Sequence, residues 1–113
     1  MEELIAFAVY GKSYVAKNWN KRFGLGGNHV YYVHSGVGGY EEYGVKKPFE
    51  AGRIYFFPVT AKALPYSDEA DPVLHTYCDF ELVPPILSTE VFCFQPTTAL
   101  LHALQKERRK SDA

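Results

Sequence analysis

Short apolar and aromatic runs, separated by turn residues, recur along most of this chain. The clearest are Val30–Val33 and Ile54–Phe57, because β-branched and aromatic residues fill both. Another strand is expected at 4–10 and continues, after a bulge or bend, through 14–16. Further strands are expected at 38–43, at 59–66 with an interruption at Pro65, at 73–82 and at 90–94. Short strands between frequent turns are typical of an all-β sandwich or barrel.

The pattern changes after Pro96. Thr97 or Thr98 can cap a helix, and three leucines follow at helical spacing on one side, at positions 100, 101 and 104. Lysines and arginines gather near the end, where a helix dipole favours positive charge. The sequence therefore predicts a β-domain over residues 1–95 and the start of an α-helix over residues 96–113.

Composition narrows the functional classes. The 113 residues suit one domain, and 47% hydrophobic with 22% charged residues excludes a disordered chain. The formal net charge of −1 argues against unaided binding to duplex DNA, which needs basic surface. No apolar stretch approaches the roughly 20 residues of a membrane span, and the acidic N-terminus is unlike a secretory signal. We therefore expect a cytoplasmic protein that does not bind membranes.

Cys78 and Cys93 lie within aromatic, apolar segments. We expect both to be buried free thiols rather than a disulfide. Their spacing does not form a zinc motif.

One ordered series of residues resembles the cupin-like N-terminal sensing domain of AraC-type transcription regulators. The matching positions are 30–38, Gly44, 48–49, 51–54, 57–58, 71–72, 74–77 and Phe80. This resemblance implies a double-stranded β-helix, or jelly roll, whose mouth holds one small ligand. The positions of two glycines are consistent with this fold, because Gly36 and Gly52 lie in tight connections where we expect a positive φ. Pro58 lacks an amide hydrogen and is expected to end the preceding strand.

Metal-binding members of the cupin family carry three histidines and a glutamate, and this sequence departs from that pattern. His29 takes the glutamate position, the upstream histidine positions fall near Phe23 to Leu25, and the later one falls near Ala63. Only one of the four ligand positions then carries an imidazole, which is too few ligands to bind a transition metal tightly. We expect no metal, no other cofactor and no enzymatic activity.

Five residues are candidate ligand contacts. His29 and Tyr31 share one face of their strand, while His34 lies on the other face and is expected at the surface. His75 and Tyr77 also share a face with Asp79, and they resemble the histidine–aromatic pair that contacts sugar in the family's arabinose-binding member. Tyr31 as plain core and His29 as a rim residue remain alternatives.

Trp19, the fifth candidate, precedes this core in a glycine-rich polar stretch. Its large amphipathic ring could stack on a ligand or anchor the loop by packing onto the barrel, and the sequence favours neither role over the other.

The resemblance implies a ligand-sensing and dimerisation domain that binds a sugar-like metabolite. Family members form homodimers and contact DNA through a C-terminal helix-turn-helix domain, and this sequence stops before any such domain. Two alternatives stay open. One is a free-standing cupin enzyme, such as a sugar isomerase or epimerase, and the other is a structural dimerisation module filled by its own aromatic rings.

Overall fold

The computed structural model describes residues 4–15, 28–83 and 87–97, which form eight β-strands and no helix. The strands are β1 (Leu4–Tyr14), β2 (Asn28–Ser35), β3 (Gly38–Glu42), β4 (Val45–Pro48), β5 (Ile54–Phe57), β6 (Ala63–Ser67), β7 (Leu74–Val83) and β8 (Phe92–Phe94). The all-β prediction is confirmed for this part of the chain. The helix expected after Pro96 lies almost entirely in residues 98–113, outside the described ranges. Within those ranges no helix could cross a bilayer.

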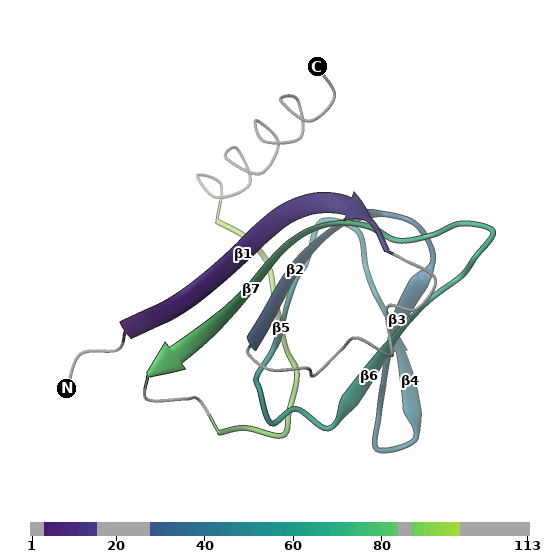
Figure 1. Cartoon of the computed structure of the whole chain (residues 1–113). Coiled ribbons are helices and arrows are strands. Elements are labelled where there is room, and N and C mark those ends of the chain that lie inside the picture. The colour runs from purple at the N-terminus through teal and green to yellow at the C-terminus, as the bar shows by residue number, and fades with distance from the viewer. Residues whose placement is uncertain (1–3, 16–27, 84–86, 98–113) are drawn as a thin grey trace.

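The strands form two antiparallel sheets that face each other (Figure 1). The larger sheet has the order β1-β7-β2-β5-β8, and the smaller one the order β4-β3-β6. The chain crosses between the sheets after β2, β4, β5 and β6. Short connections alone make these crossings, which explains the regular turn signals of the sequence.

The expected closed barrel is not present in the described residues. The edge strands β1 and β8 of the larger sheet pair with no strand of the smaller sheet. The described structure is an open two-sheet sandwich, because no pair of hydrogen-bonded strands joins the two sheets. Closure would need additional pairing at both edges.

Strand boundaries follow the sequence where side chains are buried and depart from it elsewhere. β5 has the expected bounds, and Pro58 follows its last residue. β4 was not expected, because all four of its residues are exposed and it carries no apolar alternation. β6 begins at Ala63 and runs through Pro65, which an edge strand tolerates because it needs fewer amide donors. The irregularity in β1 lies between Ile5 and Phe7, earlier than expected.

Both glycine predictions are confirmed. Gly36 has a φ of 96° and Gly52 a φ of 85°. Gly36 also packs tightly on the backbone before β7, since an added Cβ would lie 2.3 Å from the carbonyl oxygen of Pro72. This contact fixes how the chain passes from the larger sheet to the smaller one.

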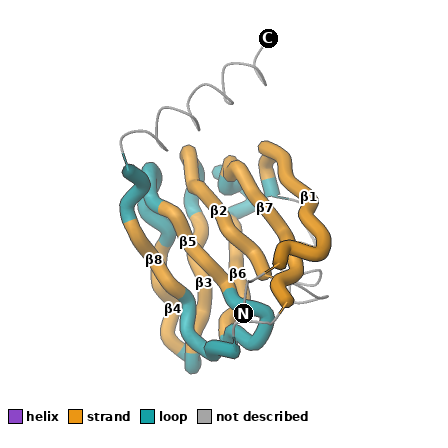
Figure 2. The backbone as a smooth tube through the Cα atoms, turned by 90° about the vertical axis from the view of Figure 1, so that its left-hand side faces the viewer, coloured by secondary structure: helices purple, strands orange, loops and turns teal. Residues whose placement is uncertain are grey.

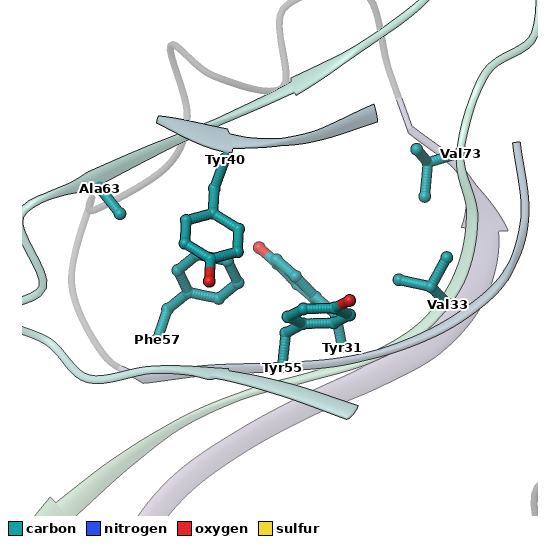
Figure 3. Packing of buried hydrophobic residues seen from close by; sticks show 7 residues of the cluster. All are labelled: Tyr31, Val33, Tyr40, Tyr55, Phe57, Ala63 and Val73. Atoms are coloured by element: carbon teal, nitrogen blue, oxygen red, sulfur yellow. The ribbon is translucent and has the colours of Figure 1, made fainter. Parts of the chain in front are cut away.

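Aromatic side chains fill the space between the sheets (Figure 3). Phe57 is fully buried and lies 5.6 Å from Tyr40 of the opposite sheet, ring centre to ring centre. Tyr31 lies 5.3 Å from Phe57, and Tyr55 lies 6.1 Å from Tyr40. Val33, Ala63 and Val73 complete this core. Such tilted and edge-on ring pairs stabilise the packing beyond simple burial.

The cysteine prediction is half right. Both thiols are free, but Cys78 is only partly buried and Cys93 is exposed. Cys93 lies on β8, an edge strand with no described neighbour on its outer side.

Candidate functional site

Four of the five candidate residues come together on adjacent strands of the larger sheet. His29 and Tyr31 lie on β2, and His75 and Tyr77 lie on β7. The register sets Tyr31 directly opposite Tyr77, and His29 opposite Asp79. Because side chains alternate along a strand, all of them point to the face that carries the aromatic core.

Tyr31 is the centre of this group. Its ring centre lies 4.9 Å from that of His75 in an edge-on contact, and 6.0 Å from that of His29. The ring of Tyr77 lies 5.2 Å from His75 on the other side. Tyr31, His29 and His75 are buried, whereas Tyr77 is partly exposed. The group therefore runs from the aromatic core outward.

His29 is held by an acidic partner. Its Nδ1 lies 2.7 Å from Oδ1 of Asp79, whose side chain is 39% exposed. A carboxylate accepts hydrogen bonds only, so Nδ1 donates, and the lone pair of a neutral ring lies on Nε2. Nε2 is itself buried. Asp79 thus orients the His29 ring, whose second nitrogen lies inside the sandwich.

His75 is held by the backbone instead. Its Nδ1 donates to the carbonyl oxygen of Ser13 on β1 over 2.9 Å. Burial lowers the pKa of His75 from its ordinary value of 6.5, and this effect outweighs the opposing influence of the Ser13 carbonyl and Asp79. The ring is therefore neutral at neutral pH and also has its lone pair on Nε2.

Tyr77 lies over a glycine of the edge strand. A Cβ placed on Gly11 would be 2.8 Å from the Tyr77 hydroxyl oxygen, so only glycine leaves room for the ring in this position. Gly11 is also the register partner of Tyr77 on β1. This contact could not be predicted from the sequence, because Gly11 there resembles an ordinary turn residue.

The group lies on the second and third strands from the β1 edge of the larger sheet. The smaller sheet contributes Tyr40 and Ala63 to the core, and Tyr40 packs against Tyr55 and Phe57 of β5. Figure 2 shows the β1–β7 pair to one side of β4, β3 and β6. On the inward face of β7, His75 is buried, whereas Tyr77 and Asp79 are half-buried.

Other predictions for the site have mixed outcomes. Trp19 lies outside the described residues. His34 faces outward as expected, but it is half-buried and its Nε2 lies 2.7 Å from the Thr76 hydroxyl.

The contacts that hold the two imidazoles depend on pairing between strands. The alternation of 75, 77 and 79 places Asp79 on the correct face, but its pairing with His29 follows only from the register between β2 and β7. Ser13 had no signal in the sequence, because its backbone carbonyl makes the contact.

Within residues 4–15, 28–83 and 87–97, no three histidine, cysteine or acidic side chains come together in a way that could hold a metal ion. Comparison with protein-family models and with curated proteins finds no match to this chain. The site itself combines a neutral imidazole, His75, a second imidazole paired with the Asp79 carboxylate, and two phenol groups beside an aromatic core.

Proposed function

We propose that this chain is the ligand-sensing and dimerisation domain of an AraC-type transcription regulator, and that it binds a small sugar-like metabolite. The observation that carries this proposal is the inward-facing group of His29, Tyr31, His75, Tyr77 and Asp79 on two adjacent strands. The two-sheet arrangement is compatible with the jelly roll that the resemblance implies.

The chemistry of this group suits a neutral polyhydroxyl ligand. The Asp79 carboxylate accepts hydrogen bonds from hydroxyl groups, and the tyrosine hydroxyls both donate and accept. The partly exposed Tyr77 ring offers a flat surface for the apolar face of a pyranose. A neutral His75 adds no charge that would require an anionic ligand.

In the proposed regulator the protein is a cytoplasmic homodimer, and DNA binding belongs to a helix-turn-helix domain. Ligand binding alters DNA binding only by favouring one arrangement of the domains over another. The domain itself has no enzymatic activity.

Thermal melts with a panel of mono- and disaccharides and sugar acids test the proposal. A ligand at about 100 times its Kd stabilises the folded state by roughly 2.7 kcal/mol, which raises the melting temperature by several degrees. We expect at least one neutral sugar to do so.

Two tyrosine variants provide the matched control. Tyr77→Phe removes a hydroxyl from the proposed site, and Tyr66→Phe removes one from a partly buried tyrosine of the smaller sheet. The sugar-induced shift should fall in the first variant and persist in the second. An equal effect of both variants, or no shift with any sugar, would contradict the proposal.

The His29–Asp79 pair favours one second candidate, a free-standing cupin enzyme. An imidazole supported by a carboxylate is a plausible general base for isomerising or epimerising a sugar. Turnover of sugar substrates that is lost in His29→Asn would establish this function in place of the sensor.

The aromatic core favours a third candidate, a purely structural dimerisation module. Tyr40, Tyr55 and Phe57 already fill the interior beneath the smaller sheet. A protein that dimerises but is stabilised by no member of the panel would fit this candidate.

A further inference from the structure

Strand β1 is the edge strand that runs beside the site along β7 (Figure 1). The antiparallel pairing of the two strands is regular in this part of β1. Gly11 pairs with Tyr77, and Ser13 pairs with His75. Two small residues of β1 therefore stand beside the two rings that β7 contributes to the site, on the side away from β2.

The hydroxyl end of the Tyr77 ring fills the place where residue 11 would carry a side chain. A Cβ added to Gly11 would lie 2.8 Å from the Tyr77 hydroxyl oxygen, 3.0 Å from Cζ and 3.2 Å from Cε1. Register partners point to the same face of a sheet, so this close approach means that the Tyr77 side chain leans toward β1 across Gly11. A side chain at position 11 would compete with the phenol for this space.

The backbone at position 11 does not itself require glycine. Gly11 lies within β1, and the positive φ values of the described glycines occur at Gly36, Gly44 and Gly52 instead. Within a strand, glycine destabilises the fold relative to alanine, because it loses more conformational freedom and packs no side chain. What glycine provides here is the space that the Tyr77 ring occupies.

The second ring of β7 is held by β1 in a different way. The Nδ1 of His75 donates to the Ser13 carbonyl oxygen over 2.9 Å, and the ring centres of His75 and Tyr77 lie 5.2 Å apart. His75 is buried, whereas Tyr77 is half-buried and Ser13 is exposed. One ring is thus fixed by a backbone hydrogen bond, and the other is placed by the space above a glycine. A change at position 11 therefore acts on Tyr77, while His75 keeps its own contact.

We propose that Gly11 is a positioning residue for recognition: by leaving room for the Tyr77 phenol over β1, it sets where this ring and its hydroxyl meet a bound sugar. An alanine at position 11 forces the hydroxyl oxygen to move by about 0.6 Å or more before it reaches an ordinary contact distance of 3.4 Å. The groups of a binding site have to be held within about 0.5 Å of their productive geometry. This inference rests on the proposed function, because it gives Gly11 a role in the same site.

Proton NMR of the protein without any sugar tests the placement of the ring. We expect nuclear Overhauser contacts between the Gly11 α-protons and the Tyr77 ε-protons in the wild-type protein. In Gly11→Ala the resonances of the Tyr77 ring should move, while His75 keeps a protonated Nδ1 because the Ser13 carbonyl still holds it. The variant should melt within a few degrees of the wild-type protein, since the end of a tyrosine side chain gives way more easily than backbone does.

Thermal melts with the neutral sugars of the panel, D-glucose, D-galactose and maltose among them, test the consequence for binding. Each sugar that stabilises the wild-type protein should have a Kd about tenfold higher in Gly11→Ala, the effect of losing one hydrogen bond. Lys12→Ala is the matched control, because Lys12 is the next residue of β1 and its side chain lies on the outer face of the sheet, away from the aromatic core. This variant should leave the Kd unchanged.

A double variant separates an effect through the ring from a general effect on the strand. If Gly11 acts through Tyr77, the variant that combines Gly11→Ala with Tyr77→Ala should bind sugar as Tyr77→Ala alone does. Two effects that simply add would mean that position 11 acts on the sugar by another route.

Four results would overturn the proposal. They are missing Overhauser contacts between Gly11 and Tyr77, Tyr77 resonances that stay in place in Gly11→Ala, a sugar affinity that Gly11→Ala leaves unchanged, and an affinity loss that Lys12→Ala shares or that adds to the effect of Tyr77→Ala. A panel in which no sugar raises the melting temperature would remove the proposed function, and with it the role in recognition. The NMR contacts would then still show whether Gly11 places the ring, so the two failures are distinguishable.

Discussion

At the scale of single residues, two imidazoles on neighbouring strands are oriented by different acceptors. Asp79 holds His29, and the backbone carbonyl of Ser13 holds His75. Both rings donate through Nδ1, so both have the lone pair on Nε2 when neutral. This shared tautomer is directly measurable.

Asp79→Ala should release the His29 tautomer. Long-range ¹H–¹⁵N spectra of the wild-type protein are expected to show protonated Nδ1 on both histidines, and in the variant His29 should become a mixture of tautomers. His75 is the internal control, because Ser13 still holds it. Because Asp79 is 39% exposed, the free energy of unfolding should change by less than about 1 kcal/mol. An unchanged His29 spectrum would contradict this account of the pair.

His75 should make the stability of the protein sensitive to acid. Its pKa is lowered from 6.5 in the folded state, so the unfolded chain binds a proton at a higher pH than the folded one does. The contribution of His75 is complete above about pH 6.5 and declines as the pH falls through the lowered folded value.

Urea unfolding between pH 5 and pH 7.5 measures this decline. His75→Asn keeps a donor for the Ser13 carbonyl and should flatten the decline, whereas His34→Asn, on the outer face, should preserve it. A decline that is equally steep in His75→Asn would show that other groups cause it.

At the scale of elements, strand positions could be predicted where burial imposes a pattern. Val30–Val33 and Ile54–Phe57 lie within β2 and β5 because β-branched and aromatic residues fill them. β4 could not be found, since its four exposed residues carry no such pattern. The faces of His29, Tyr31, His75 and Tyr77 followed from alternation alone. Their partners did not, because Asp79 and Ser13 are brought in by registers between strands far apart in the sequence.

The connections between strands give a matched pair of glycine variants. Gly36 and Gly52 both have positive φ, but only Gly36 has backbone within reach of a new Cβ. Gly52→Ala should cost about 1–2 kcal/mol of unfolding free energy from backbone strain alone. Gly36→Ala should cost about 3 kcal/mol or more, because the Cβ would also meet Pro72. Urea denaturation checks this, and equal costs would mean that the Gly36–Pro72 contact is not tight.

At the scale of the whole molecule, one buried carboxylate ties the sheets together. Glu42 of β3 accepts hydrogen bonds from Lys47 of β4 at 2.8 Å and from the Val91 amide, just before β8, at 3.0 Å. The Tyr43 hydroxyl donates to Thr89 in the same region. These contacts anchor the edge of the larger sheet to the end of the smaller one.

Glu42→Ala should therefore loosen the join between the sheets. It leaves the Val91 amide without its acceptor and should cost about 1–3 kcal/mol. Glu42→Gln keeps an acceptor oxygen and should cost clearly less. Hydrogen exchange of the Val91 amide should quicken in the alanine variant only, and equal exchange in both variants would argue against this role of the carboxylate.

The unequal burial of the core and the candidate site has an evolutionary consequence. The rings between the sheets are buried, whereas the Asp79 side chain is 39% exposed. In the proposed sensor, a substitution at Asp79 would therefore alter ligand binding with little loss of folding free energy. A lineage carrying this scaffold could diversify its specificity rapidly while its architecture drifted slowly.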